Sequence, residues 1–285
     1  MLLFITYLMT SVIKERKSIF RNKPTYSKDR YNNRRRTSRP SFGIFCFKHG
    51  EIIEDTKYLM VMRRNSYAYE EFIRGSYHID DINYIRQLMS RITKSEAERI
   101  INSEFEELWE DLNKAYSVTT TDPYKLHLAK ENFYKIKNNA NLYNFDEENR
   151  KNIKWNDPEW CFPKGKKNDQ NEDDIECSKR ELFEETKLTE DDYNLKTLVP
   201  RLIKYEADNG VTYENTFYFA EVKELKEIEI DNSDERQKAE VGKIEWLSKE
   251  ECREKIRDYH TYILDTFEKC NEVCDGLFNL VKKVI

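Results

Sequence analysis

Hydrophobic and polar residues change their spacing several times along this chain, and each change predicts a different element. Residues 41–49 and 57–63 are short runs rich in aromatic and aliphatic side chains, separated by a polar turn at Gly50. Such runs predict the two strands of a β-hairpin. From residue 80 to 116 the apolar residues recur three and four apart, and a second stretch of this kind covers 124–136. This spacing is typical of helices.

Strand character returns in the second half of the chain. Further strands are expected at residues 160–162, 195–205, 213–222 and 243–247. Ser248 followed by Glu251 has the pattern of a capping box that opens a helix, and residues 262–284 have the amphipathic pattern of a long terminal helix. The order of elements predicts an α+β sandwich whose first strands are separated from the others by a helical insertion.

The composition fits a protein that folds around an aromatic core. The chain has 285 residues, enough for one large domain or one domain with an insertion. Only 38% of the residues are hydrophobic, but 18 Tyr and 15 Phe supply bulky core side chains. The six cysteines form no Cys-x-x-Cys pair, and the four histidines have no zinc-finger spacing. We therefore expect reduced thiols in an intracellular protein instead of a disulfide framework.

The charge is distributed unevenly along the chain. Residues 1–40 hold 11 Lys and Arg against two Asp and Glu, a net +9, which leaves −14 on the rest of a chain whose total is −5. Arg34, Arg35 and Arg36 lie among tyrosines in this stretch. The pattern predicts a basic N-terminal tail that binds a polyanion such as RNA. A solubilising, disordered terminus gives the same pattern and stays open.

The first 13 residues are mostly apolar. They fall short of the roughly 20 apolar residues that cross a bilayer, so no transmembrane span is expected here. The basic residues follow this stretch, whereas in a secretory signal they precede it. An interfacial helix or an organelle-targeting element stays open.

Three carboxylates stand close together after an arginine. Glu181, Glu184 and Glu185 follow Arg180 at spacings of three and four residues, which place them on one face of a helix. Mg²⁺ prefers oxygen ligands and is usually held by carboxylates together with substrate phosphates. A solvated helix face produces similar strings, but a strand and a Gly-bearing loop lead directly into this one. The segment predicts a diphosphate hydrolase.

The same segment resembles the Nudix box, which reads Gly, five residues, Glu, seven residues, Arg-Glu-apolar-x-Glu-Glu-x-Gly-apolar. Glu172 stands eight residues before Arg180, as in that pattern. Two positions depart from it: Gly165 comes one residue early, and Lys187 replaces the second glycine. The early glycine predicts a longer loop before the helix, and the lysine an altered turn after it.

The resemblance implies a Nudix α/β/α sandwich that binds Mg²⁺ or Mn²⁺. The metal ligands would be Glu181, Glu184 and Glu185. Arg180 would orient a glutamate, and a loop with Lys164, Gly165 and Lys166 would contact the substrate phosphates.

A fourth acid is expected at Glu240, in the sequence Glu-Val-Gly-Lys-Ile-Glu-Trp. The segment is similar to one in the cellular Nudix decapping enzyme that adds an acid to the metal site. An exposed loop glutamate is the alternative interpretation. Either Glu185 or Glu240 would then act as general base.

Residues 63–77 are rich in arginine and aromatic residues, which suits a nucleotide site at the exit of a strand. They resemble the segment after the first strands in the Nudix decapping enzymes of poxviruses and asfarviruses. By position, the resemblance implies that Tyr67 covers one face of the methylated guanine and that Phe217, or Tyr218 instead, covers the other. Asp208 would recognise the base edge. Packing in the core is the alternative role of these aromatic residues.

The resemblance covers about residues 41–285 and implies mRNA decapping that releases 7-methyl-GDP and leaves a 5′-monophosphate RNA. Arg63, Arg64 and Arg74 would add to the electrostatic attraction of RNA by the tail. Hydrolysis of diphosphoinositol polyphosphates or of free nucleoside diphosphate derivatives stays open, as does an inactive RNA-binding module.

We expect the protein to act in the host cytoplasm during infection, and packaging in virions stays open. We also expect self-association through the helical insertion. The expected divisions are a tail at 1–40, a first Nudix part at 41–76, a helical insertion at 77–150 and a catalytic part at 151–285.

Overall fold

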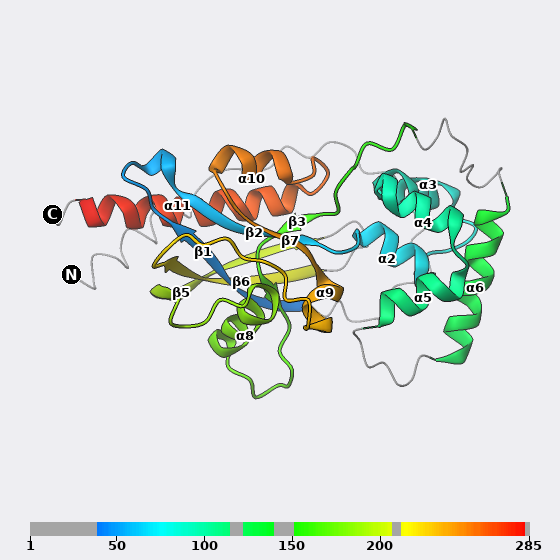
Figure 1. Cartoon of the computed structure of the whole chain (residues 1–285), viewed down its shortest axis with the longest axis horizontal. Coiled ribbons are helices and arrows are strands. Elements are labelled where there is room, and N and C mark those ends of the chain that lie inside the picture. The colour runs from blue at the N-terminus through cyan, green and yellow to red at the C-terminus, as the bar shows by residue number, and fades with distance from the viewer. Residues whose placement is uncertain (1–38, 115–121, 140–150, 207–211, 283–285) are drawn as a thin grey trace. The chain divides into compact units, whose positions relative to one another are not determined.

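The fold is taken from a computed structural model, which describes residues 39–114, 122–139, 151–206 and 212–282 (Figure 1). The N-terminal basic segment with Arg34, Arg35 and Arg36, the apolar first residues and Asp208 lie outside the described residues.

A mixed β-sheet forms the centre of the fold. Strand β1 (Arg39–Lys48) pairs antiparallel with β2 (Lys57–Arg63) and parallel with β6 (Thr212–Val222). Strand β5 (Tyr193–Glu206) extends the sheet beyond β6. The strands β3 (Trp160–Cys161) and β7 (Val241–Leu247) pair with β2, and β4 (Lys164–Gly165) pairs with β1. The predicted hairpin and the later strands are confirmed.

Helices cover both faces of this sheet. Phe45 and Phe47 of β1 point to one face and pack in a cluster with Phe267 of α11 (Thr261–Lys282). Ile44 and Cys46 alternate to the other face, where they pack with Leu182 of α8 (Asp174–Thr186). The result is an α/β/α sandwich, with α8 on one side and α11 on the other (Figure 1).

The remaining short elements surround the sheet. A 3₁₀ turn, η1 (Ile53–Asp55), lies between β1 and β2, and α9 (Glu235–Glu240) leads directly into β7. Helix α10 (Lys249–Lys255) begins with the predicted capping box, in which the Ser248 side chain accepts a bond from Glu251 N at 3.2 Å. Across the described ranges, no helix combines the length and apolar character that crossing a membrane requires.

In the described residues between β2 and β3, five helices form a second packing unit. They are α2 (Tyr67–Ile73), α3 (Ile82–Arg91), α4 (Lys94–Asn102), α5 (Phe105–Asn113) and α6 (Pro123–Lys137). Phe72, Met89 and Phe133 are among the buried side chains of their common core. The helical character expected from residue 80 onward is confirmed. Helix α2 was not foreseen: Ser66 caps its start, accepting from Tyr69 N at 3.1 Å, and Phe72 commits it to the helical core.

Two buried glutamates hold the start of α2 from opposite elements. Ser66 N donates to Glu96 of α4 at 2.6 Å, and Tyr67 N donates to Glu159, which precedes β3, at 3.1 Å. Arg257 donates to the other oxygen of Glu159 at 3.1 Å. Both glutamates are at most 2% exposed. A buried carboxylate without partners is strongly destabilising. The bonds of Glu159 therefore tie the helical unit to the sheet at Tyr67, and the bond of Glu96 fixes the start of α2 within the helical unit.

Candidate active site

The carboxylates of α8 are organised by Arg180. Its guanidinium donates to Glu172 at 2.7 Å, to Glu181 at 2.8 Å and to Glu184 at 3.1 Å. It also donates to the backbone oxygen of Lys166 at 2.7 Å, which closes the loop between β4 and α8. The bond from Arg180 lowers the pKa of Glu172 to about 2. Arg180 thus fixes both the loop and two of the expected metal ligands.

Glu185 lies apart from this clamp. Its Oε2 atom is buried and has no hydrogen-bond partner among the described residues. Burial, reinforced by the nearby charges of Glu181 and Glu240, raises the pKa of Glu185 to about 8, although Lys164 opposes the shift. Burial also raises the pKa of Glu181, against the effect of Arg180. A cation beside Glu185 would therefore stabilise its ionised form, which burial and the neighbouring carboxylates disfavour.

Glu240 meets the α8 carboxylates although it is distant in sequence. It is the last residue of α9, and Glu181, Glu184, Glu185 and Glu240 all line one cavity of about 730 Å³. Gly165 lines the same cavity, and a Cβ atom added to it would lie 2.1 Å from Glu181 Oε2. Only a glycine at this position leaves room for the carboxylate.

The acidic end of the cavity fits a divalent cation. As they stand, no three or more His, Cys, Asp and Glu side chains in the described part of the chain are arranged to hold a metal ion. Arg180 holds two of the candidate ligands, Glu181 and Glu184. The unpartnered oxygen of Glu185 and the mutual repulsion of three carboxylates are nevertheless features that a cation would satisfy.

A small aromatic pocket of about 20 Å³ adjoins the acidic cavity. Tyr67 and Lys164 line both cavities, and the aromatic one is completed by Tyr205, Phe217 and Tyr262. The Tyr67 ring is 37% exposed and lies 4.0 Å below the guanidinium carbon of Arg63. Tyr205 stacks on Tyr262 with ring centroids 4.1 Å apart. This pair was missed in the sequence, because nothing local connects an end of β5 to the start of α11.

The other predicted aromatic residues lie deeper in the fold. Phe217 is only 1% exposed and packs edge-on against Phe162 in the core. Tyr218 is 8% exposed and belongs to the cluster on the opposite face of the sheet, with Leu182. The structure thus brings Tyr67 and Phe217 together in one cavity and places Tyr218 away from it.

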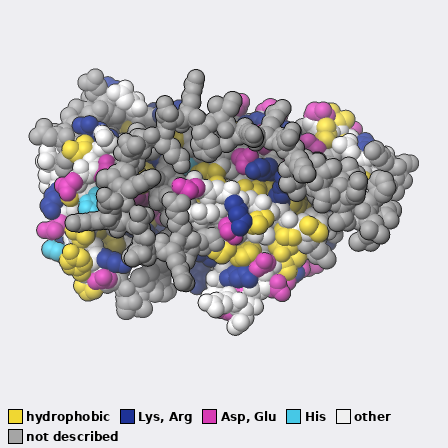
Figure 2. Space-filling model, turned by 180° about the vertical axis from the view of Figure 1, so that it is seen from behind, with side chains coloured by type: hydrophobic (Ala, Val, Ile, Leu, Met, Phe, Trp, Pro, Cys, Tyr) yellow, Lys and Arg dark blue, Asp and Glu magenta, His cyan; other side chains and the backbone are white. Residues whose placement is uncertain are grey.

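The arginines expected to bind RNA have acidic or amide neighbours. Arg63 pairs with Glu70 at 2.5 Å, Arg64 pairs with Asp111 at 2.6 Å, and Arg74 donates to Asn113 at 3.3 Å. On the described part of the face seen in Figure 2, Lys and Arg side chains are scattered among Asp and Glu side chains. The basic side chains that line the acidic cavity are Arg63, Lys164, Lys166, Lys167, Arg180 and Arg236.

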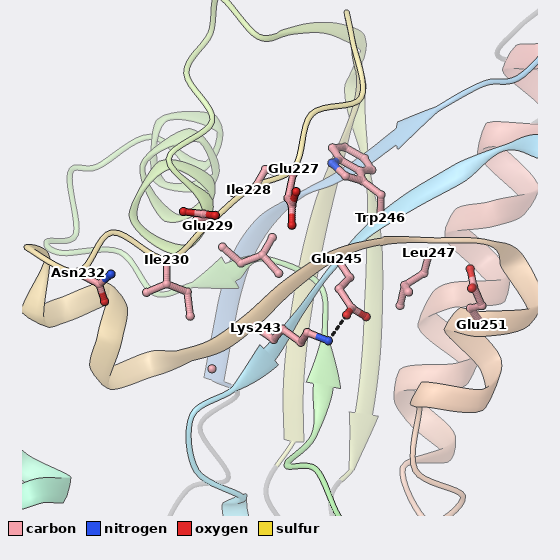
Figure 3. Close-up of a pocket in the computed structure, with 12 residues that line it drawn as sticks. Glu227, Ile228, Glu229, Ile230, Asn232, Lys243, Glu245, Trp246, Leu247 and Glu251 are labelled. Atoms are coloured by element: carbon pink, nitrogen blue, oxygen red, sulfur yellow. Dashed lines mark ion pairs between the residues drawn. The ribbon is translucent and has the colours of Figure 1, made fainter.

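A separate, open groove lies beside β7 (Figure 3). Its lining includes Glu227, Glu229, Trp246 and an ion pair between Lys243 and Glu245. None of the residues that the sequence analysis assigned to a metal or to phosphates lines this groove, so the acidic cavity is the better candidate active site.

Comparison with known proteins gives a family match in the second half of the chain. Residues 147–267 match the family model of the NUDIX domain, and this range contains the four carboxylates of the acidic cavity. Hydrolases of this family generally use divalent metal ions.

Two viral proteins are homologous to a larger part of the chain. The "putative mRNA-decapping protein" of Acanthamoeba polyphaga mimivirus is 31% identical over 240 residues, covering 76% of this chain and 64% of the mimivirus protein. The mRNA-decapping protein g5R of an African swine fever virus isolate is 25% identical over 225 residues, covering 75% of this chain and 86% of that protein. The chain thus spans less than two thirds of the length of the mimivirus relative. A C. elegans Ap4A hydrolase structure aligns with a TM-score of 0.40 and 11% identity, over 83% of this chain and 98% of that one.

Proposed function

We propose that this protein is a metal-dependent mRNA-decapping enzyme that releases 7-methyl-GDP and leaves a 5′-monophosphate RNA. The observation that carries the proposal is the junction of two cavities, one lined by four carboxylates and the other by aromatic rings, with Tyr67 and Lys164 in both walls. A cap has the matching order of parts, a planar base joined to a triphosphate. Homology to the two viral proteins named for decapping supports the same substrate.

The acidic end would carry out the hydrolysis. When bound there, Mg²⁺ or Mn²⁺ supplies charge neutralisation for the phosphates and activation of the attacking water. The ligands that we assign are Glu181, Glu184, Glu185 and Glu240. Arg180 orients Glu181 and Glu184 by charge-assisted bonds. Glu185 would take the proton of the water through its Oε2 atom, which has no hydrogen-bond partner among the described residues. Its pKa of about 8 holds for the metal-free site, and a bound cation would lower it. Glu240 is the rival for this role.

The aromatic end would hold the cap. Tyr67, which is 37% exposed, offers for stacking on the guanine the ring face that Arg63 does not cover. We add Tyr205 and Tyr262 to Phe217 as the opposing wall, and we propose that this pocket of about 20 Å³ opens to admit the base. We keep Asp208 as the residue for the base edge. Lys164 lies between the two ends, since both Tyr67 and Glu185 contribute to raising its pKa against the effect of burial. Its charge would meet the triphosphate, with Gly165 and Lys166 beside it.

The tail and the arginines outside the two cavities would help to bind the RNA chain of the capped mRNA. The N-terminal tail, with Arg34, Arg35 and Arg36, supplies sequence-independent attraction, supported by Arg63, Arg64 and Arg74. Because strand β1 begins at Arg39, we end the tail at residue 38 instead of residue 40. The helical unit is an insertion in the catalytic domain, and the packing of α2 favours a boundary at Ser66 over one at residue 76. We further propose action in the host cytoplasm, with virion packaging and self-association through the insertion as subsidiary hypotheses.

A hydrolase of diphosphoinositol polyphosphates or free nucleoside diphosphate derivatives is the second candidate. The lysines Lys164, Lys166 and Lys167 at the acidic cavity suit any polyphosphate. An inositol ring has no face that gains from stacking on Tyr67, however, so the aromatic cavity favours the cap.

The test uses RNA with a radiolabelled 7-methylguanosine cap, the full-length protein and Mg²⁺ or Mn²⁺, with products separated by thin-layer chromatography. Wild type should release 7-methyl-GDP, and Glu184→Gln should release far less. Glu176→Gln is the matched control, because Glu176 lies on the same helix but is 59% exposed and pairs with Lys179. Equal activity of Glu184→Gln and wild type, or a folded wild type that releases no 7-methyl-GDP, would contradict the proposal.

A further inference from the structure

Glu240 owes its position to a very short helix. Helix α9 contains six residues, Glu235–Glu240, and isolated helices of this length are not stable in water. Its geometry must therefore come from contacts with other elements. At its C-terminal end, Arg64 N donates to Glu240 O at 2.9 Å, which joins α9 to the end of β2.

The N-terminal end of α9 is bound to the last turn of α8. Asp234 caps α9, accepting from Arg236 N at 2.9 Å and from Gln237 N at 3.0 Å. The same carboxylate forms an ion pair with Lys187, the residue that ends α8. Gln237 is 2% exposed and donates through Nε2 to the backbone oxygen of Glu185 at 2.9 Å. Two contacts thus connect α9 to the helix that carries the other three acids.

Lys187 occupies a backbone conformation that lysine rarely adopts. Its φ of 60° and ψ of 10° lie in the left-handed region that favours glycine, and it is the only non-glycine residue with positive φ in the described part of the chain. This is the position at which the Nudix pattern has glycine. The ion pair with Asp234 is a specific gain that a glycine could not provide, and its partners are only 25% and 31% exposed.

We infer that Lys187, Asp234 and Gln237 are positioning residues that hold the Glu240 carboxylate in register with Glu181 and Glu185. The inference rests on the proposed role of Glu240 as a fourth metal ligand or as general base. The three residues touch neither metal nor substrate in this proposal; they act through α9. The proximity of Glu240 to the other acids is reflected in its contribution to raising the pKa of both Glu181 and Glu185.

Lys187→Gly is the decisive variant, because glycine suits the left-handed turn; it removes the ion pair with Asp234 together with the contact of Lys187 Nζ with the Phe183 ring, 5.2 Å away. Asp234→Asn retains a side chain that can cap α9 and removes only the charge. We expect either variant to weaken Mn²⁺ binding by about 10- to 100-fold, as is typical when groups that orient metal ligands are lost. Free Mn²⁺, followed by electron paramagnetic resonance, measures the affinity. Amide hydrogen exchange in the metal-free protein should rise in α9 and remain unchanged in α11.

A double-mutant cycle tests whether Lys187 affects metal binding by positioning Glu240. In a Glu240→Gln background, Lys187→Gly should cause no further loss of Mn²⁺ affinity. Lys179→Ala is the matched control, because Lys179 also lies on α8 and forms ion pairs with Glu176 and Glu190. Additive losses, a loss equal to that of Lys179→Ala, or absence of Mn²⁺ binding by wild type would overturn the inference. If the cycle is non-additive but the protein does not cleave caps, the positioning role of Lys187 is supported and only the proposed decapping activity is rejected.

Discussion

The two ends of the candidate active site are built in different ways. At the acidic end, three of the four carboxylates come from two turns of one helix, and a single arginine of that helix holds two of them. At the aromatic end, Tyr67, Tyr205 and Tyr262 come from three elements that meet only through the folded core. Changes at the acidic end should therefore alter chemistry without unfolding the protein, whereas changes at the aromatic end combine effects on binding and packing.

The largest expected effect is at Glu185. Glu185→Gln should lower kcat for cap hydrolysis by about 10²- to 10⁴-fold, the range for loss of a general base. Glu240→Gln should cost less if Glu185 is the base. Single-turnover measurements at saturating capped RNA and Mn²⁺ would check the ranking. A larger loss in Glu240→Gln would exchange the two roles.

A smaller but more specific effect is expected at Gly165. In Gly165→Ala the new methyl group would displace Glu181, since its Cβ lies 2.1 Å from Oε2. We expect an increase in the Mn²⁺ dissociation constant of about 10- to 100-fold, as for misplaced metal ligands. Gly276→Ala in α11 is the control, because a Cβ there meets nothing within 4 Å. Unchanged affinity in Gly165→Ala would remove Glu181 from the ligand set.

Tyr67 should separate the two candidate substrates. Loss of one base–aromatic stack costs about 1–3 kcal/mol, so Tyr67→Ala should raise KM for capped RNA by about 5- to 150-fold. Cleavage of a diphosphoinositol polyphosphate should be unaffected. Tyr124→Ala, at a tyrosine of α6 that is 70% exposed, serves as control. Equal losses on both substrates would show that Tyr67 is structural.

The pH dependence of metal binding is the mildest test of the acidic end. Because the pKa of Glu185 is about 8, a proton competes with the cation below that pH. Mn²⁺ affinity should rise with pH up to about 8, by at most about tenfold per pH unit for one displaced proton. Calorimetric titrations from pH 6 to 9 would show the slope, which should flatten in Glu185→Gln.

The raised pKa of Glu185 also predicts how the free energy of unfolding of the metal-free protein changes with pH. The native state keeps a proton on Glu185 that the unfolded chain releases above a pKa near 4.5. The free energy of unfolding of the metal-free protein should therefore fall as the pH rises from about 4.5 to 8. Thermal unfolding of wild type and Glu185→Gln across this range would isolate the contribution, and parallel curves would contradict it.

The acidic end of the site could be predicted from the sequence better than the aromatic end, because its residues are closer together along the chain. Glu181, Glu184 and Glu185 are neighbours at helical pitch, so their common face follows from periodicity alone. The hairpin and the helices beyond residue 80 are predicted for the same local reason. The stacking of Tyr205 on Tyr262 and the burial of Phe217 depend on how α11 packs on the sheet. Likewise, the ion pair of Lys187 with Asp234 depends on the path of the chain between β6 and α9, which no short pattern encodes.

Because Glu96 and Glu159 bind the start of α2, the helical unit cannot be deleted without disturbing the rest of the protein. Joining β2 directly to β3 would remove Ser66 and Tyr67 together with the five helices, and Glu159 would lose the amide that now binds one of its oxygens. Arg257 also donates to the backbone oxygen of Arg91 at 2.6 Å, a bond that such a deletion would remove. A shortened catalytic domain would therefore need a new hydrogen-bond donor for the Glu159 carboxylate as well as a new loop. The helical unit and the sheet should accordingly unfold as one cooperative body, and a protease that opens one should expose the other.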